Sequence, residues 1–243
     1  FIMLIVALAF VLLLIFGVPI AFVIGITGIL HMLLIPNSNL TEVVTQRLFS
    51  GINDFSLLAI PFFVLAGELM NNSGITTKLL ALSKNLVGHL RGGLAYVNVL
   101  IGLFLGAILG SANAEAAIRS SVVVPEMERQ GFPKRFAAAL TATSSVIGPI
   151  HPPSIVFIIY AVLTGSSVGA MFLAGIIPAF LIALAHMVVI YFFARKMQLE
   201  VHPFPSLKKL LLSIVESIPA LLIPVIILGG IYSGVFTPTE AGA

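Results

Sequence analysis

The sequence contains no cysteine and no tryptophan, and only 9% of its 243 residues are charged. The absence of cysteine excludes a disulfide framework and a cysteine-ligated zinc site. Soluble domains carry about 25% charged residues, whereas this chain is 59% hydrophobic with a mean hydropathy of +1.17. The composition therefore predicts a polytopic integral membrane protein.

Catalytic motifs are also missing. The chain has no H-E-x-x-H, no G-x-S-x-G and no P-loop. The net charge of +3 is too small to indicate nucleic-acid binding. We therefore expect no enzyme activity, no organic cofactor and no ATP hydrolysis, so that energy must come from an ion gradient or a partner subunit.

Apolar runs dominate the first third of the chain. Residues 1–35 would measure about 52 Å as one helix, well beyond a hydrocarbon core of about 30 Å. Gly17-Val18-Pro19 interrupts this run, which fits either two short helices or one strongly kinked helix. Residues 36–39 are expected to form a loop, and residues 40–50 a short amphipathic surface helix.

The following segments alternate between spans and connectors. An apolar segment at 55–70 is followed by residues 75–90, whose Leu79 and Leu82 face one way and Ser83 and Asn85 the other. That pattern predicts a helix lying along the membrane surface. Farther along, spans are expected at 169–194 and 217–232, separated by a polar connector and an amphipathic stretch.

Two polar, small-residue breaks interrupt the central apolar region, at 110–115 (GSANAE) and 148–154 (GPIHPPS). Backbone groups in hydrocarbon need internal partners, so such breaks survive only where protein or water covers them. The arms at 94–110 and 115–127 would measure about 25 and 20 Å, which is short for full spans. We therefore predict a re-entrant hairpin with its tip at 110–115.

Basic residues are distributed asymmetrically along the chain. Ten of the twelve fall in 71–93, 128–135 and 195–209. The positive-inside rule assigns these segments to the cytoplasmic side. The predicted hairpin then opens toward the cytoplasm and directs its tip toward the midplane.

Five runs resemble, in the same order, the large membrane subunit of tripartite ATP-independent periplasmic (TRAP) transporters: Phe55–Thr76, Val87–Val99, Gly110–Ala117, Ser144–Ile155 and Phe236–Ala243. The resemblance implies a sodium-driven importer of organic acids, such as sialic acid or C4-dicarboxylates, in the bacterial inner membrane. It also implies a periplasmic substrate-binding protein and a small four-helix membrane subunit, separate or fused, as partners.

The fold implied by the resemblance is all-α, the first inverted repeat of an elevator-type ion-transporter-superfamily fold. Scaffold helices would occupy 1–93, and the transport-domain hairpin and discontinuous helix 94–165. A spanning helix and connector would follow at 166–205, and the start of a second repeat at 206–243. Since most of that second repeat is absent, we expect the chain to be part of a longer transporter.

The sequence departs from the family pattern at three positions. Glu115 ends the first break, where the family commonly has Asp, and Arg119 lies in the following turn, where the family commonly has no basic residue. His151 replaces a usual aliphatic residue in the second break. These differences bear on which residues bind ligands.

The breaks supply oxygen atoms of the kind that a hard cation prefers. The expected sodium-binding residues are Gly110, Ser111, Ala112, Asn113, Ser145, Gly148 and Pro149. The expected substrate-binding residues are Asn113, Arg119, His151 and Ser154. Alternatively, the small residues only permit close helix packing, His151 is satisfied by nearby carbonyls, and Arg119 pairs with Glu115 on one helix face.

Other functions remain open from the residues alone. Broken helices also line channel pores, so an ion channel is one alternative, and an ion-coupled transporter without a binding protein is another. An intramembrane enzyme is disfavoured by the missing motifs. A purely structural scaffold would leave Ser111 and Asn113 without a purpose.

Overall fold

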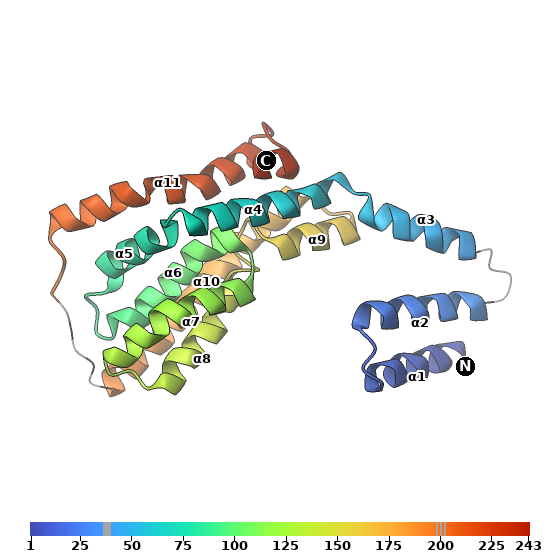
Figure 1. The fold of residues 1–243 in the computed structure, drawn as a ribbon, viewed down its shortest axis with the longest axis horizontal. Helices are drawn as coiled ribbons and strands as arrows, with labels where there is room; N and C mark the ends of the chain where they lie inside the picture. The colour runs from blue at the N-terminus through green and yellow to red at the C-terminus, as the bar shows by residue number, and fades with distance from the viewer. Residues whose placement is uncertain (36–39, 198, 200, 202) are drawn as a thin grey trace. The chain divides into compact units, whose positions relative to one another are not determined.

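The computed structural model describes residues 1–35, 40–197, 199, 201 and 203–243, and for residues 40–43 it describes the backbone alone. The predicted loop at 36–39 lies outside the described residues. Within these ranges the secondary structure consists of helices without strands (Figure 1). The chain divides into two units, residues 1–54 and 55–243.

The first unit resolves the two alternatives for residues 1–35. Helix α1 covers Ile2–Ile15 and α2 covers Ile20–Leu34, and the two helices pack against each other (Figure 1). The break at Gly17–Pro19 therefore separates two short helices. Helix α3, Leu40–Ile52, follows.

The second unit is built around α6, Gly93–Leu109. Fourteen of its 17 residues are buried, and it packs against α4, α5, α7, α8 and α10. A helix that is apolar on all sides is stable where other helices surround it. The remaining elements are η1 (Phe55–Leu58), α4 (Ala59–Asn72), α5 (Ile75–Val87), α7 (Ala112–Arg129), α8 (Lys134–Ser144), η2 (Ser145–Ile147), α9 (Ile155–Thr164), α10 (Val168–Lys196), α11 (Leu207–Tyr232) and α12 (Pro238–Gly242).

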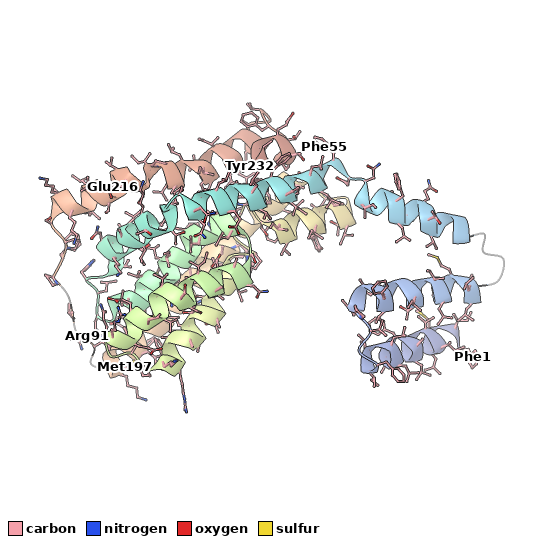
Figure 2. All side chains as sticks on the ribbon, in the orientation of Figure 1. Phe1, Phe55, Arg91, Met197, Glu216 and Tyr232 are labelled. Atoms are coloured by element: carbon pink, nitrogen blue, oxygen red, sulfur yellow. The ribbon has the colours of Figure 1, made fainter. Side chains whose placement is uncertain are left out.

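Three helical stretches of the described chain are long and apolar enough to cross a membrane: 55–72, 168–196 and 207–232. Helix α6 is apolar but shorter, about 26 Å at 1.5 Å per residue. Figure 2 places Arg91 and Met197 together at one end of the second unit, and Phe55 and Tyr232 at the other. The helices of this unit therefore share a common long direction.

Three sequence expectations are corrected in the second unit. Helix α7 starts at Ala112, so the first break contains only Gly110 and Ser111 outside the helices. The expected amphipathic stretch and the last span form one helix, α11. Ser83 and Asn85 are buried instead of facing away from the core, because α11 and α6 both pack along α5.

Candidate functional site

The first break is a tight turn between α6 and α7. Gly110 ends α6 in the left-handed region, with φ of +57°, where a residue with a Cβ would be strained. Ser111 is the N-cap of α7, and its Oγ accepts a hydrogen bond from the Ala114 N–H. Such a cap satisfies a helix N–H that would otherwise lack a partner.

The second break separates α8 from α9. The chain leaves η2 at Gly148, passes through the cis Pro152–Pro153 bond and re-enters helix at Ile155. Ser154 caps α9 by accepting a hydrogen bond from the Phe157 N–H, and it donates its own hydroxyl proton to the Pro149 carbonyl. The buried Ser154 side chain thus links Pro149, near the start of the break, to the first turn of α9.

The two breaks lie against each other. A methyl group added at Gly110 would lie 3.3 Å from the Pro153 carbonyl oxygen and 3.3 Å from the Ile155 nitrogen. One added at Gly148 would collide with the Glu115 carboxylate in the first turn of α7. The structure therefore brings together two interruptions that lie about forty residues apart in sequence.

A fully buried ion pair lies beside this junction. Arg119 Nη2 donates to Glu115 Oε2 at 2.9 Å, and neither side chain is exposed to solvent. This confirms the expected pairing on one face of α7. Buried charges persist only when they are paired and hydrogen-bonded.

The Arg119 guanidinium also connects three segments of the fold. Nη1 donates to the Asn98 carbonyl of α6 and to Ser144 Oγ of α8, both at 2.9 Å. Nη2 donates to Ser145 Oγ at 2.8 Å. The hairpin and the start of the second break are therefore tied together through a single side chain.

Asn98, Thr141 and Gly102 also belong to this network and were not predicted from the sequence. Asn98 Nδ2 donates to Thr141 Oγ1 at 2.7 Å, which links α6 to α8. Gly102 leaves room for the guanidinium, since a methyl group there would lie 2.5 Å from Arg119 Nη1. The available signal was Asn98 itself, because a polar side chain inside an apolar membrane helix requires an internal partner.

Some of the predicted sodium-binding residues carry oxygen atoms that form no hydrogen bond within the described part of the chain, and others carry oxygen atoms that already form one. The Gly110 and Gly148 carbonyls and the Asn113 side chain make no hydrogen bond with any described residue, and Asn113 is exposed. By contrast, Ser145 Oγ accepts from Arg119 and donates to the Thr141 carbonyl, and the Pro149 carbonyl accepts from Ser154. Ala112 lies within helix α7.

The predicted substrate-binding residues lie in different surroundings. Asn113 is exposed at the tip, whereas Ser154 and Arg119 are completely buried. His151 is largely buried and lines an apolar cavity of about 180 Å³ with Leu103 and Phe180. Its Nδ1 has no hydrogen-bond partner among the described groups. Substrate binding by these residues stays a prediction.

Two atoms of the buried pair also lack partners in the described part of the chain, Glu115 Oε1 and Arg119 Nε. The Glu115 oxygen faces Gly148 at the second break and Gly106 of α6. Because the guanidinium neutralises most of the carboxylate charge, the junction of the breaks has little net charge of its own. A carboxylate oxygen with a free lone pair nevertheless favours a cation beside it.

Comparison with known proteins identifies the family of the chain. Residues 7–243 match the family described as the tripartite ATP-independent periplasmic transporter, DctM component. The chain is 42% identical over 227 residues to the sialic acid TRAP transporter large permease protein SiaM of Vibrio cholerae, which covers 93% of this chain and 53% of that protein.

Two further relatives have similar identities. The C4-dicarboxylate TRAP transporter large permease protein DctM of Pseudomonas aeruginosa is 42% identical over 219 residues, covering 90% of this chain and 51% of that protein. The 2,3-diketo-L-gulonate large permease protein YiaN of Escherichia coli is 41% identical over 227 residues, with 93% and 53% coverage. The chain spans about half the length of these curated relatives. It therefore belongs to the DctM family of tripartite ATP-independent periplasmic transporter components.

Proposed function

We propose that this chain forms part of the membrane subunit of a sodium-driven secondary transporter that imports an organic acid. The observation that supports this function is the contact between the two chain breaks, where Gly110 packs against Pro153 and Ile155. Two related permeases are named for sialic acid and C4-dicarboxylate. A carboxylate of this kind, delivered by a periplasmic binding protein, is the substrate class that we propose here.

The proposed sodium site uses the oxygen atoms that the fold leaves unpaired. These are the Gly110 and Gly148 carbonyls and the Asn113 amide oxygen, with Glu115 Oε1 as a nearby carboxylate oxygen. The Ser111 hydroxyl already accepts from the Ala114 N–H and would contribute its second lone pair. Sodium, like other hard cations, prefers such neutral and anionic oxygen ligands. Ala112, Ser145 and Pro149 hold this backbone in place instead of presenting free oxygens.

Arg119 fits a positioning role better than direct substrate contact. Its two Nη groups already donate to Glu115, Asn98, Ser144 and Ser145. Freeing it to bind a substrate carboxylate would leave Glu115 buried without its partner, which is costly. Of the predicted substrate ligands, the exposed Asn113 is therefore the one that can meet a substrate without rearrangement.

The hairpin and the broken helix are proposed to move together. Helices α6 and α7 measure about 26 and 27 Å, so a re-entrant hairpin that begins and ends on one side of the membrane suits their length. The Arg119 network joins this hairpin to α8 and η2. Such a rigid body could carry the site across the membrane in an elevator-type motion against a scaffold.

The proposed transporter function requires partner proteins. We propose a periplasmic substrate-binding protein and a small membrane subunit, separate or fused, in the bacterial inner membrane. One relative, from Oleidesulfovibrio alaskensis, is named isethionate TRAP transporter permease protein DctMQ, and this chain covers 37% of it. That smaller share is consistent with an additional segment in the relative.

Uptake in proteoliposomes tests the proposal. The complete transporter is reconstituted with and without an inward sodium gradient and with and without its binding protein, using sialic acid and a C4-dicarboxylate as probes. Saturable uptake of one acid that requires both the gradient and the binding protein is expected. Conductance without saturable uptake would favour a channel, and uptake indifferent to both conditions would refute the proposed function.

A further inference from the structure

We propose that a pocket at the basic end of the second unit binds the phosphate headgroup of an anionic phospholipid. The pocket has a volume of about 580 Å³ and is lined by Leu90, Arg91, Tyr96, Tyr191, Ala194 and Arg195. It lies between the α5–α6 turn and the last turns of α10, at the end where Figure 2 places Arg91 and Met197. It is separate from the junction of the two breaks.

Two guanidinium groups give the pocket its positive charge. No carboxylate of the described residues pairs with Arg91 or Arg195. The Arg195 Cζ lies 4.4 Å from the centroid of the Tyr191 ring, a cation–π contact that orients the planar group. No described residue accepts a hydrogen bond from either guanidinium, so in this part of the structure their N–H edges are available for the bidentate bonds that phosphate oxygens accept.

A phenol supplies a further polar contact. Tyr96 is only 8% exposed, yet its hydroxyl bonds to no described residue. A tyrosine buried to this extent usually directs its hydroxyl to a partner, and the pocket is where Tyr96 remains accessible. The donor set is therefore two guanidinium groups and a phenol, which suits a phosphate anion.

The two walls of the pocket are held together where the α5–α6 turn approaches α10 closely. Gly92 has a φ of +72°, and a methyl group there would lie 2.9 Å from the Ala194 side chain. Glycine and alanine thus allow the α5–α6 turn to contact α10 directly. This contact keeps Arg91 beside Arg195.

A lipid fits better than a free phosphate because an exposed apolar strip leads to the pocket. Leu184, Val188, Tyr191 and Arg195 are spaced by four, three and four residues and are all exposed, so they lie on one face of α10. The eleven residue-to-residue steps from Leu184 to Arg195 cover about 16 Å, close to half of a hydrocarbon core of about 30 Å. Acyl chains along this strip would place the headgroup at the two arginines.

The surrounding charge agrees with this location. The neighbouring end of α7 carries Arg129 and the start of α8 carries Lys134 and Arg135. Phe132, in the turn between these helices, lies next to Gly92. The positive-inside rule assigns such an end to the cytoplasmic side, where anionic lipids attract basic pockets between helices.

Native mass spectrometry of the complete purified protein, titrated with phosphatidylglycerol, tests this inference. Arg91→Gln and Arg195→Gln are each expected to weaken binding about fivefold, and the double variant about thirtyfold, since a basic residue at the surface contributes about 1 kcal/mol. Tyr96→Phe, which keeps the buried ring, should weaken binding about two- to fivefold, because one ordinary hydrogen bond contributes about 0.5–1 kcal/mol. Arg135→Gln is the matched control and should bind like the unmodified protein.

Two further measurements distinguish a lipid headgroup from free phosphate as the bound ligand. Phosphatidylcholine should bind more weakly than phosphatidylglycerol, and millimolar inorganic phosphate should not displace the lipid. Phosphate that displaces the lipid completely would overturn a lipid site. Equal losses in Arg135→Gln and in the pocket variants, or full binding by the double variant, would also overturn the inference.

Discussion

At the residue scale, the least expected feature is an arginine and a glutamate buried completely inside an apolar hairpin. The sequence suggested that Glu115 and Arg119 could pair, because they are four residues apart. It could not show that Arg119 also reaches Asn98, Ser144 and Ser145. Those contacts depend on how different helices pack against each other. The spacing of residues within one helix carries no information about that packing.

Replacing Arg119 with Gln should destabilise the protein strongly. The change leaves Glu115 buried without a countercharge, and breaking a buried pair in this way costs about 3–5 kcal/mol. Reversible unfolding in mixed micelles measures the loss. The double variant Glu115→Gln and Arg119→Gln should recover part of it, because no uncompensated charge then remains.

Arg129→Gln is the matched control for this prediction. Arg129 pairs with Glu126 at 3.4 Å on the surface, with the arginine side chain 78% exposed, and such pairs contribute about 0–1 kcal/mol. Equal small losses at positions 119 and 129 would contradict a stabilising role for the buried pair.

Turning to the scale of elements, the sequence located both breaks and most helices. Gly17–Pro19 separates two helices as expected, and both interruptions lie within a few residues of their predicted positions. The first break is shorter than predicted, because Ser111 caps α7 immediately. A small residue such as Ala112 and a polar one such as Asn113 suit a first helical turn as well as a loop, so composition alone did not fix the boundary.

Two other helices differ from expectation for reasons of packing. Pro219 and Pro224 lie inside α11 without ending it, since membrane helices accommodate proline where neighbours satisfy the freed carbonyls. Ser83 was expected on a solvated face of α5, but α11 covers that helix and Ser83 donates to the Leu79 carbonyl instead. The polarity of one helix does not reveal what packs on it.

Ser154→Ala should loosen the start of α9. Ser154 both caps the helix and donates to the Pro149 carbonyl, so its loss should cost about 1–2 kcal/mol. Hydrogen exchange at the amides of 155–158 should accelerate about five- to thirtyfold, as expected from that loss. Ser167→Ala removes an exposed cap of α10 and is the control; equal acceleration at both helix starts would contradict the double role of Ser154.

At the scale of the whole molecule, orientation follows from charge and from the length of α10. This helix has 29 residues and measures about 44 Å, more than the thickness of the hydrocarbon core. We therefore expect its ends to lie on opposite sides of the membrane. The basic end is the one that the positive-inside rule assigns to the cytoplasm.

Single cysteines test this orientation, because these 243 residues contain none. Lys134→Cys should react with a membrane-impermeant maleimide only after the cytoplasmic side is opened, and Ser166→Cys should react from the outside. Both positions are exposed. Labelling of both cysteines from the same side would contradict the assigned topology.

The most direct test of the central claim is a sodium titration of thermal stability on the complete purified protein. A ligand that binds the folded state raises stability with its concentration, so sodium but not potassium should raise the unfolding midpoint. Asn113→Ala at the hairpin tip should need about tenfold more sodium for half of the effect, as expected when about 1.4 kcal/mol of binding is lost. Asn72→Ala, an exposed asparagine at the end of α4, should behave like the unmodified protein. An identical sodium response in all three proteins, or an equal response to potassium, would contradict a sodium site at the junction of the two breaks.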